Sequence, residues 1–206
     1  MDSVLLSSFY LAPVQYFSKL FRAEKVCIEI HDIYRKQSYR NRCLIAGANG
    51  VLPLSIPIEK TEAEKCEMKD IRISDHGNWR HLHWNALVSA YNSTPFFEYY
   101  CDDFRQFYEK KYTYLVDFNE DLRVLICRLL DIHPLVTYTE RYIETVPDGM
   151  MDFRETIHPK PIRQKPDPDF KAIPYYQVFS EKYGFLENLS IVDLLFNMGN
   201  ESRLYL

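Results

Sequence analysis

Residues 75–103, DHGNWRHLHWNALVSAYNSTPFFEYYCDD, decide the fold that we expect for this chain. From Trp79 onward, apolar side chains recur every three or four residues, which places them on one face of an α-helix. Asn78 can cap this helix, because its side-chain oxygen can accept a hydrogen bond from a free amide of the first turn. Thr94 followed by Pro95 predicts a second helix, since proline loses no hydrogen bond at the first helical position. Two aromatic-faced helices joined by a tight corner are therefore expected.

The N-terminal part of the chain predicts two parallel strands joined by a helix. Residues 4–10 (VLLSSFY) and 26–31 (VCIEIH) are short apolar runs, and Pro13 opens a helical stretch between them. A strand–helix–strand connection is right-handed and gives a parallel pair. Because such sheets usually place their site at the carboxyl ends of the strands, Tyr10 and His31 mark the expected position.

The remaining segments predict shorter elements. Residues 43–46 and 51–58 suggest a hairpin, because the Asn-Gly pair between them offers the positive-φ residues of a tight turn. The other candidates are a strand at 71–74, a helix that starts at the capping-box-like Asp117-x-x-Glu120, a strand at 136–142, and a helix from Ser190 to Gly199.

Together these elements predict an α+β fold: a single mixed-sheet domain over residues 1–206, with an N-terminal parallel strand–helix–strand unit and a helical layer at 79–131. A three-layer α/β arrangement is the alternative. Residues 147–174 hold six of the eleven prolines, mixed with charges. This composition predicts an arm without regular structure, either flexible or ordered by docking on the rest of the domain.

Composition limits the function. The net charge is −4 and the cations are dispersed, so no basic stripe predicts a nucleic-acid partner. No apolar run approaches the roughly 20 residues that span a membrane. The amino terminus lacks the basic region of a secretory signal. Five cysteines without a CxxC pair are typical of reduced core thiols, which predicts a cytoplasmic location. Oligomeric state is left open.

Histidines suggest a metal site at first sight, but their spacing argues against it. On a helix, residues two apart point about 200° away from each other, so His81 and His83 cannot share one ion. No HExxH motif or cysteine pair accompanies them, and glycine-rich phosphate loops are absent. We predict no metal and no cofactor. His83 is either a core-edge imidazole buried with a partner or a group that transfers protons near neutral pH.

Residues 31–42, HDIYRKQSYRNR, form the most cationic segment of the chain. Its four cations lie within eight residues and can bind a phosphate or a carboxylate, which arginine holds through two parallel hydrogen bonds. A solvated connecting loop is the alternative.

Several of these motifs resemble the WbqC-like family. The resemblance lies in residues 10–17 (YLAPVQYF), 36–43 (KQSYRNRC), 54–58 (LSIPI), 79–100 and 189–196 (LSIVDLLF). Many members of the family have a Gln-Pro pair and a Pro-Trp pair near the amino terminus. Here Ser8-Phe9 and Ala12-Pro13 stand instead.

The resemblance implies a bacterial protein of O-antigen or other surface-polysaccharide biosynthesis, and we expect a transferase that acts on an activated or nucleotide-linked sugar. A non-catalytic binding or scaffolding protein of the same pathway is the alternative. The expected partner is a small anionic ligand such as a sugar phosphate or nucleotide sugar. The candidate catalytic residues are His83, His31 and Tyr16, and the candidate ligand-binding residues are Arg40, Asn41 and Arg42.

Overall fold

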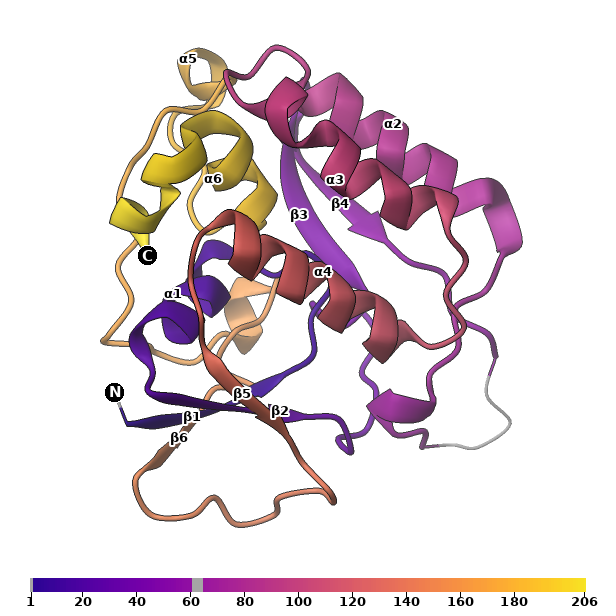
Figure 1. Cartoon of the computed structure of the whole chain (residues 1–206), viewed down its shortest axis with the longest axis vertical. Helices are drawn as coiled ribbons and strands as arrows, with labels where there is room; N and C mark the ends of the chain where they lie inside the picture. The colour runs from indigo at the N-terminus through magenta and orange to yellow at the C-terminus, as the bar shows by residue number, and fades with distance from the viewer. Residues whose placement is uncertain (1, 61–64) are drawn as a thin grey trace.

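A parallel four-stranded sheet occupies the lower part of the view in Figure 1. In this computed structural model, which describes residues 2–60 and 65–206, its strands are β1 (Ser3–Ser7), β2 (Lys25–Glu29), β5 (Leu135–Tyr138) and β6 (Met150–Asp152). Their order is β5-β2-β1-β6, and every neighbouring pair is parallel. The carboxyl ends of all four strands therefore lie along one edge of the sheet.

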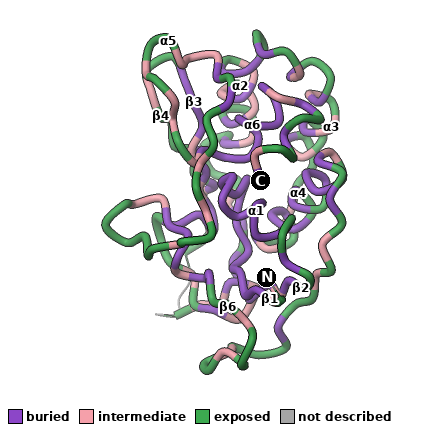
Figure 2. The backbone as a smooth tube through the Cα atoms, turned by 90° about the vertical axis from the view of Figure 1, so that its left-hand side faces the viewer, coloured by how far each residue is buried: buried purple, intermediate pink, exposed green. Residues whose placement is uncertain are grey.

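The predicted N-terminal unit is confirmed. Helix α1 (Val14–Arg22) follows Pro13 and connects β1 to β2. The central strand β1 is almost completely buried, as the tube in Figure 2 shows. β1 nevertheless ends at Ser7, so the expected strand end at Tyr10 is wrong. The chain turns at Tyr10 and Leu11, and Leu11 has a φ of 39° that no strand can continue.

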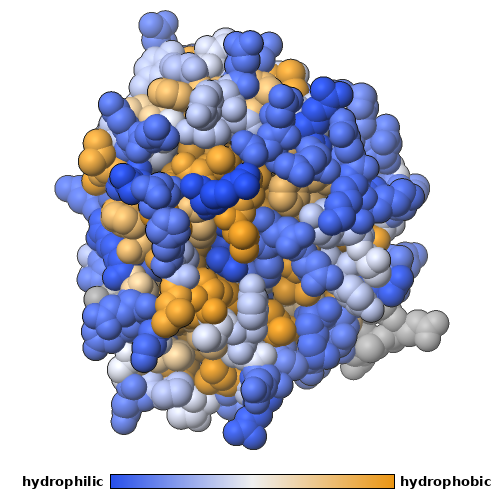
Figure 3. Space-filling model, viewed as in Figure 1, coloured by the Kyte–Doolittle hydropathy of each residue, from blue (hydrophilic) through white to orange (hydrophobic). Residues whose placement is uncertain are grey.

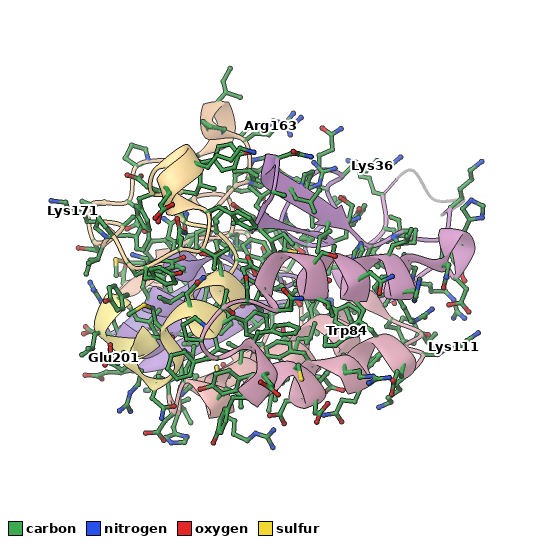
Figure 4. All side chains as sticks on the ribbon, turned by 90° about the horizontal axis from the view of Figure 1, so that it is seen from above. Lys36, Trp84, Lys111, Arg163, Lys171 and Glu201 are labelled. Carbon is green, nitrogen blue, oxygen red and sulfur yellow. The ribbon has the colours of Figure 1, made fainter. Side chains whose placement is uncertain are left out.

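A hairpin and three helices form the other half of the molecule. The hairpin joins β3 (Arg42–Gly47) to β4 (Gly50–Ser55), and Gly50 has the positive φ, 102°, that its turn requires. Asn49 does not share this conformation. The helices are α2 (Trp79–Tyr91), α3 (Phe97–Glu109) and α4 (Leu115–Leu129). α2 packs on β3 and on α3, and Trp84 lies between α2 and α3 in Figure 4, with its ring centroid 5.8 Å from that of Tyr108.

The C-terminal segment fills the centre of the helical layer. Helix α6 (Ile191–Met198) is buried on nearly all sides and packs against α1, α2 and α3. Gly199 ends it with a φ of 55°, and a β-carbon there would lie 2.6 Å from the Phe96 ring. The shorter helices are α5 (Ser180–Tyr183) and the 3₁₀ turns η1 (Met68–Asp70), η2 (His76–Asn78), η3 (Pro161–Arg163) and η4 (Gly199–Tyr205).

The predicted α+β class, the helical layer and the start of α2 at Trp79 are confirmed, but the expected helix caps are not. Asn78 does precede α2, yet it has a left-handed backbone and its side chain forms no capping bond. Thr94 donates its hydroxyl to the carbonyl of Tyr91, and α3 begins only at Phe97. Glu120 lies inside α4, where it pairs with Arg123. The side chains of Thr94 and Glu120 thus have partners other than those that the local pattern suggested.

Two expected strands are shorter than predicted. Residues 71–74 form only isolated bridges, Ile58 with Ile73 and Arg72 with Tyr114. β5 ends at Tyr138. Within the described residues, no helix is long and apolar enough to cross a membrane.

The arm at 147–174 is ordered by docking, and the expectation that it has no regular structure is wrong. It contains β6, which pairs with the buried strand β1. Farther along, Asp167 forms an ion pair of 2.8 Å with Lys19 of α1, and both side chains are almost fully buried. Gln15 donates a second hydrogen bond to Asp167, and the Lys19 ammonium lies 4.5 Å from the ring centre of Phe153.

We predict that Asp167→Ala lowers the free energy of unfolding by about 3 kcal/mol, because it leaves the Lys19 ammonium buried without a counter-charge. Urea denaturation measures the loss. Asp169→Ala is the matched control, since this nearby carboxylate is exposed and should change the stability little. Equal effects of the two substitutions would show that the buried pair does not hold the arm.

Candidate functional site

A polar cavity of about 380 Å³ lies at the carboxyl ends of the parallel strands. The ends of three strands supply six of its lining residues: His31 and Asp32 after β2, Tyr142 after β5, and Asp152, Arg154 and Glu155 at and after β6. Parallel sheets bind their ligands at this edge. The edge of the sheet at which the strand–helix–strand unit predicted a site therefore has a cavity lined mostly by charged side chains.

Arg40 is the central cation of the cavity wall, although only 2 % of its surface is exposed. Its Nε donates to Asp32 over 3.0 Å, and its Nη2 donates to Asp32 as well. The same Nη2 reaches the hydroxyl of Ser7, the last residue of β1, at 3.0 Å and a carboxylate oxygen of Glu155 at 3.3 Å. One guanidinium thus joins the ends of β1, β2 and β6.

Asp32 is buried, and only one of its two carboxylate oxygens has hydrogen-bond partners among the described residues. Its Oδ2 accepts hydrogen bonds from Ser7 and Arg40. Its Oδ1 is buried without a hydrogen-bond partner among the described residues. A buried carboxylate oxygen without a donor is costly, so such atoms in native proteins call for an explanation.

His31 is held in a fixed orientation at the same cavity. Its Nδ1 lies 2.9 Å from Oε2 of Glu67, and its backbone amide donates to the buried carboxylate of Glu29. The hydrogen bond with His31, together with Lys69, lowers the pKa of Glu67. When Nδ1 donates to a carboxylate, Nε2 remains as the acceptor nitrogen. Nε2 has no protein partner within the part of the chain described here, so it is available to a ligand.

Arg154 forms a second charged network. Its Nε and Nη2 donate to Asp152, while Nη1 donates to the carbonyl of Ile143 and to Glu29, which is fully buried. Burial alone would raise the pKa of Asp152, but the hydrogen bonds from Arg154 outweigh it and lower the pKa. The guanidinium also lies 5.0 Å from the ring centre of Tyr142. These contacts fasten β6 and the loop before it to the end of β2.

The structure brings together two of the six predicted site residues, His31 and Arg40. Asn41 instead fastens the backbone, since its side chain donates to the carbonyl of Ile56 and its own carbonyl accepts from the Ile56 amide. Arg42 lies in the first position of β3 and donates to the Ser55 hydroxyl at 2.8 Å. Neither residue lines the cavity.

Tyr16 and His83 lie in the hydrophobic core. The Tyr16 hydroxyl is buried, and burial raises its pKa. His83 is 5 % exposed, its Nδ1 is 3.0 Å from the Tyr10 hydroxyl, and its ring lies edge-on to Trp79. Burial lowers the pKa of His83 to about 4, against a smaller opposing effect of a hydrogen bond with the Ser55 backbone. The imidazole is therefore neutral at neutral pH, which agrees with the interpretation as a core residue.

Sequence reasoning missed most of the cavity wall. Asp32 follows His31 in the cationic segment. The cations of this segment suggested an anionic ligand, whereas Asp32 is the counter-charge of one of them, Arg40. Asp152, Arg154 and Glu155 fall in the proline-rich arm, and the only local signal was the apolar pair Met150-Met151 before a charged run. No group of three or more metal-ligating side chains is assembled within residues 2–60 and 65–206.

The sequence model of the WbqC-like protein family matches residues 8–155, which is more than half of the chain. The protein belongs to the WbqC-like family. The match includes the cationic segment, the aromatic helices and the strand β6, and it ends before the helix α6 that also resembled the family. It therefore covers every side chain of the cavity wall named above. No curated protein and no solved structure matches the chain.

The depressed pKa of His83 predicts a loss of stability in acid. Because the folded pKa, about 4, lies below the ordinary value of 6.5, the unfolded chain binds the proton first as the pH falls. The contribution to stability is complete above pH 6.5 and is lost as the pH falls toward 4, and it amounts to about 3 kcal/mol.

Chemical denaturation between pH 7 and pH 4 tests this prediction. In the His83→Gln variant, the loss of unfolding free energy between these two pH values should be smaller by about 3 kcal/mol. His81→Gln is the control on the same helix, because His81 is exposed. If His83→Gln leaves the pH dependence of the unfolding free energy unchanged, the result contradicts the burial of a neutral imidazole.

Proposed function

We propose that this protein is a transferase of bacterial surface-polysaccharide biosynthesis that acts on an activated or nucleotide-linked sugar. We place its site in the cavity at the carboxyl ends of the parallel strands. The observation that carries the proposal is the His31–Glu67 pair, in which a carboxylate orients an imidazole at the wall of a polar cavity. A cytoplasmic location, which its activated substrates would require, is part of the proposal; the five free cysteines fit it.

In this mechanism His31 is the general base. The attacking hydroxyl or amine of the acceptor passes its proton to Nε2 of His31 as its new bond forms, and the bond to the leaving group breaks with both electrons on that group. Glu67 stabilises the imidazolium that results. General bases of this kind contribute about 10²- to 10⁴-fold in rate.

The anionic part of the substrate is assigned to the mouth of the cavity. Arg35 lines the cavity, its side chain is 59 % exposed, and among the described residues its one ion pair is with Glu155, at 2.7 Å. An exposed guanidinium can exchange one carboxylate for a phosphate at little cost in desolvation. Arg40, in contrast, is enclosed by three protein partners. The two arginines therefore have different roles in this proposal: Arg35 binds the phosphate, and Arg40 holds the cavity wall together.

A binding or scaffolding protein of the same pathway is the second candidate. Its supporting observation is the exposure of large apolar side chains such as Ile162 and Leu204, which are 92 % and 74 % exposed. On the face shown in Figure 3, however, apolar side chains lie in several patches separated by polar ones. Binding surfaces for proteins are more often continuous. The cavity at the strand ends, with its charged lining residues, favours a small ligand.

We expect His31→Gln to abolish function while the protein stays folded, because glutamine keeps a polar side chain at the edge of the sheet but cannot accept and return a proton. The readout is the surface polysaccharide made by a strain that lacks the gene and carries the variant. Glu67→Gln should reduce function less, since it only weakens the orientation of His31.

His133→Gln is the control, because the side chain of His133 is 81 % exposed and does not line the cavity. Melting temperatures of all variants separate loss of function from loss of fold. Full complementation by a folded His31→Gln protein would sink the catalytic proposal and favour the binding protein.

A further inference from the structure

A second pocket, of about 770 Å³, adjoins the cavity at the strand ends. The end of β5, the first two turns of α4 and the segment 110–114 before this helix line it. Ile30 lines the pocket and His31, the next residue, lines the cavity, so the two hollows lie next to each other at the end of β2. We call the second one the α4 pocket.

Glu120 is the buried acid of the α4 pocket. Only 8 % of its surface is exposed, and its Oε2 accepts hydrogen bonds from Arg123 at 2.7 Å and from the Tyr138 hydroxyl at 3.2 Å. Its Oε1 accepts none from the described residues, but it keeps accessible surface, unlike Oδ1 of Asp32. Because Glu120 lines the pocket, a ligand there can donate a hydrogen bond to this oxygen.

The charges around the α4 pocket balance. Three carboxylates and two lysines line it, namely Asp117, Glu120, Asp121, Lys110 and Lys111. The sixth charge is that of Arg123, which is buried and bonded to Glu120. Since Glu120 already has a counter-charge, the pocket does not require a cation, and an anion would meet its carboxylate without gaining a free guanidinium. A neutral ligand that donates hydrogen bonds fits this wall best.

Two tyrosine rings provide the apolar part of the wall. Tyr114, the residue before α4, and Tyr138, at the end of β5, both line the pocket, and more than a third of each is exposed. The Tyr138 hydroxyl is bonded to Glu120 and Arg123, which fixes the ring. A sugar ring has C–H groups on its faces and hydroxyls around its edge. Its face can therefore pack on a tyrosine ring while its hydroxyls reach the carboxylates.

We propose that the α4 pocket binds the acceptor glycan, the sugar chain to which the activated sugar is transferred. A sugar hydroxyl donates to Oε1 of Glu120, and sugar rings pack on Tyr114 and Tyr138. The pocket has about twice the volume of the cavity, which leaves room for more than one sugar unit. The role as acceptor rests on the proposed function, whereas the binding of a glycan does not. The donor occupies the cavity, and the acceptor reaches His31 across the end of β2.

Titration calorimetry on the whole protein tests the inference. The probes are short, lipid-free oligosaccharides released by partial acid hydrolysis from the surface polysaccharide of the bacterium that carries the gene. Uridine-diphosphate glucose is the comparison probe for the cavity. We expect at least one oligosaccharide to bind, and His31→Gln to leave its affinity unchanged within about two-fold, because His31 does not line the α4 pocket.

Two variants assign the binding to the α4 pocket. Tyr114→Ala should weaken the affinity by about ten-fold, because it removes a ring on which a sugar packs. Its control is Tyr99→Ala, since Tyr99 on α3 is exposed and lies outside the pocket. Glu120→Gln should weaken the affinity by about ten-fold as well, because it removes a charged acceptor. This second variant leaves Arg123 buried without a counter-charge and can unfold the protein, in which case Tyr114→Ala decides the test.

The outcomes separate this inference from the proposed function. If uridine-diphosphate glucose binds and no oligosaccharide does, the glycan pocket is overturned and the donor site stands. If Tyr114→Ala and a folded Glu120→Gln protein both keep the affinity, the glycan binds elsewhere and the inference is overturned. If the oligosaccharide binds through Tyr114 but His31→Gln complements fully, the catalytic proposal fails and the glycan pocket stands. If neither kind of probe binds, both fail.

Discussion

The buried guanidinium of Arg40 is the interaction on which the arrangement of this protein most depends. It links the end of β1 through Ser7, the loop after β2 through Asp32, and the loop after β6 through Glu155. Its own carbonyl accepts a hydrogen bond from Asn119 of α4. A buried guanidinium must have its donors satisfied, so these segments can adopt only the arrangement that surrounds it. The cavity is the space that remains beside this network.

The same requirement explains why other buried ion pairs link segments that are far apart in the sequence. Arg154 and Glu29 bind β6 to β2, and Lys19 and Asp167 bind the following segment to α1. None of these pairs joins neighbours in the sequence. Buried pairs add little net stability, but removing one partner is costly, so they specify which segment lies where. Apolar packing supplies the bulk of the core, whereas these ions determine the position of the C-terminal half against the sheet.

Local patterns in the sequence predicted what local forces determine. The spacing of apolar residues located α2 and α3, because each helix buries one face and is long enough to show its period. The spacing also placed His83 on the inner side of α2. It could not predict the lowered pKa of His83, because this depends on burial beside residues far away in the chain, such as Tyr10. The strand β6, in contrast, has only three residues, which are too few to show an alternation of apolar and polar side chains.

The cavity was only partly predictable for the same reason. The strand–helix–strand unit indicated the correct edge of the sheet and included His31, and the cationic segment included Arg40. Asp152, Arg154 and Glu155 reach that edge because β6 pairs with β1, which lies more than 140 residues earlier in the chain. Such non-local pairing leaves no trace in the spacing of residues. Charge alone also did not distinguish Arg40, which lines the cavity, from Arg42, which is the first residue of β3 and does not line it.

The pairing of β6 with β1 also has a consequence for biosynthesis. β1 is made before the other strands of its sheet, and one of its two neighbours, β6, is the last of them to be made. Until then the backbone N–H and C=O groups along that edge of β1 are unpaired, and closing so long a loop is a slow step in folding. The nascent chain therefore carries an unpaired sheet edge until residues 150–152 have been made, and such an edge is the kind of surface that chaperones cover.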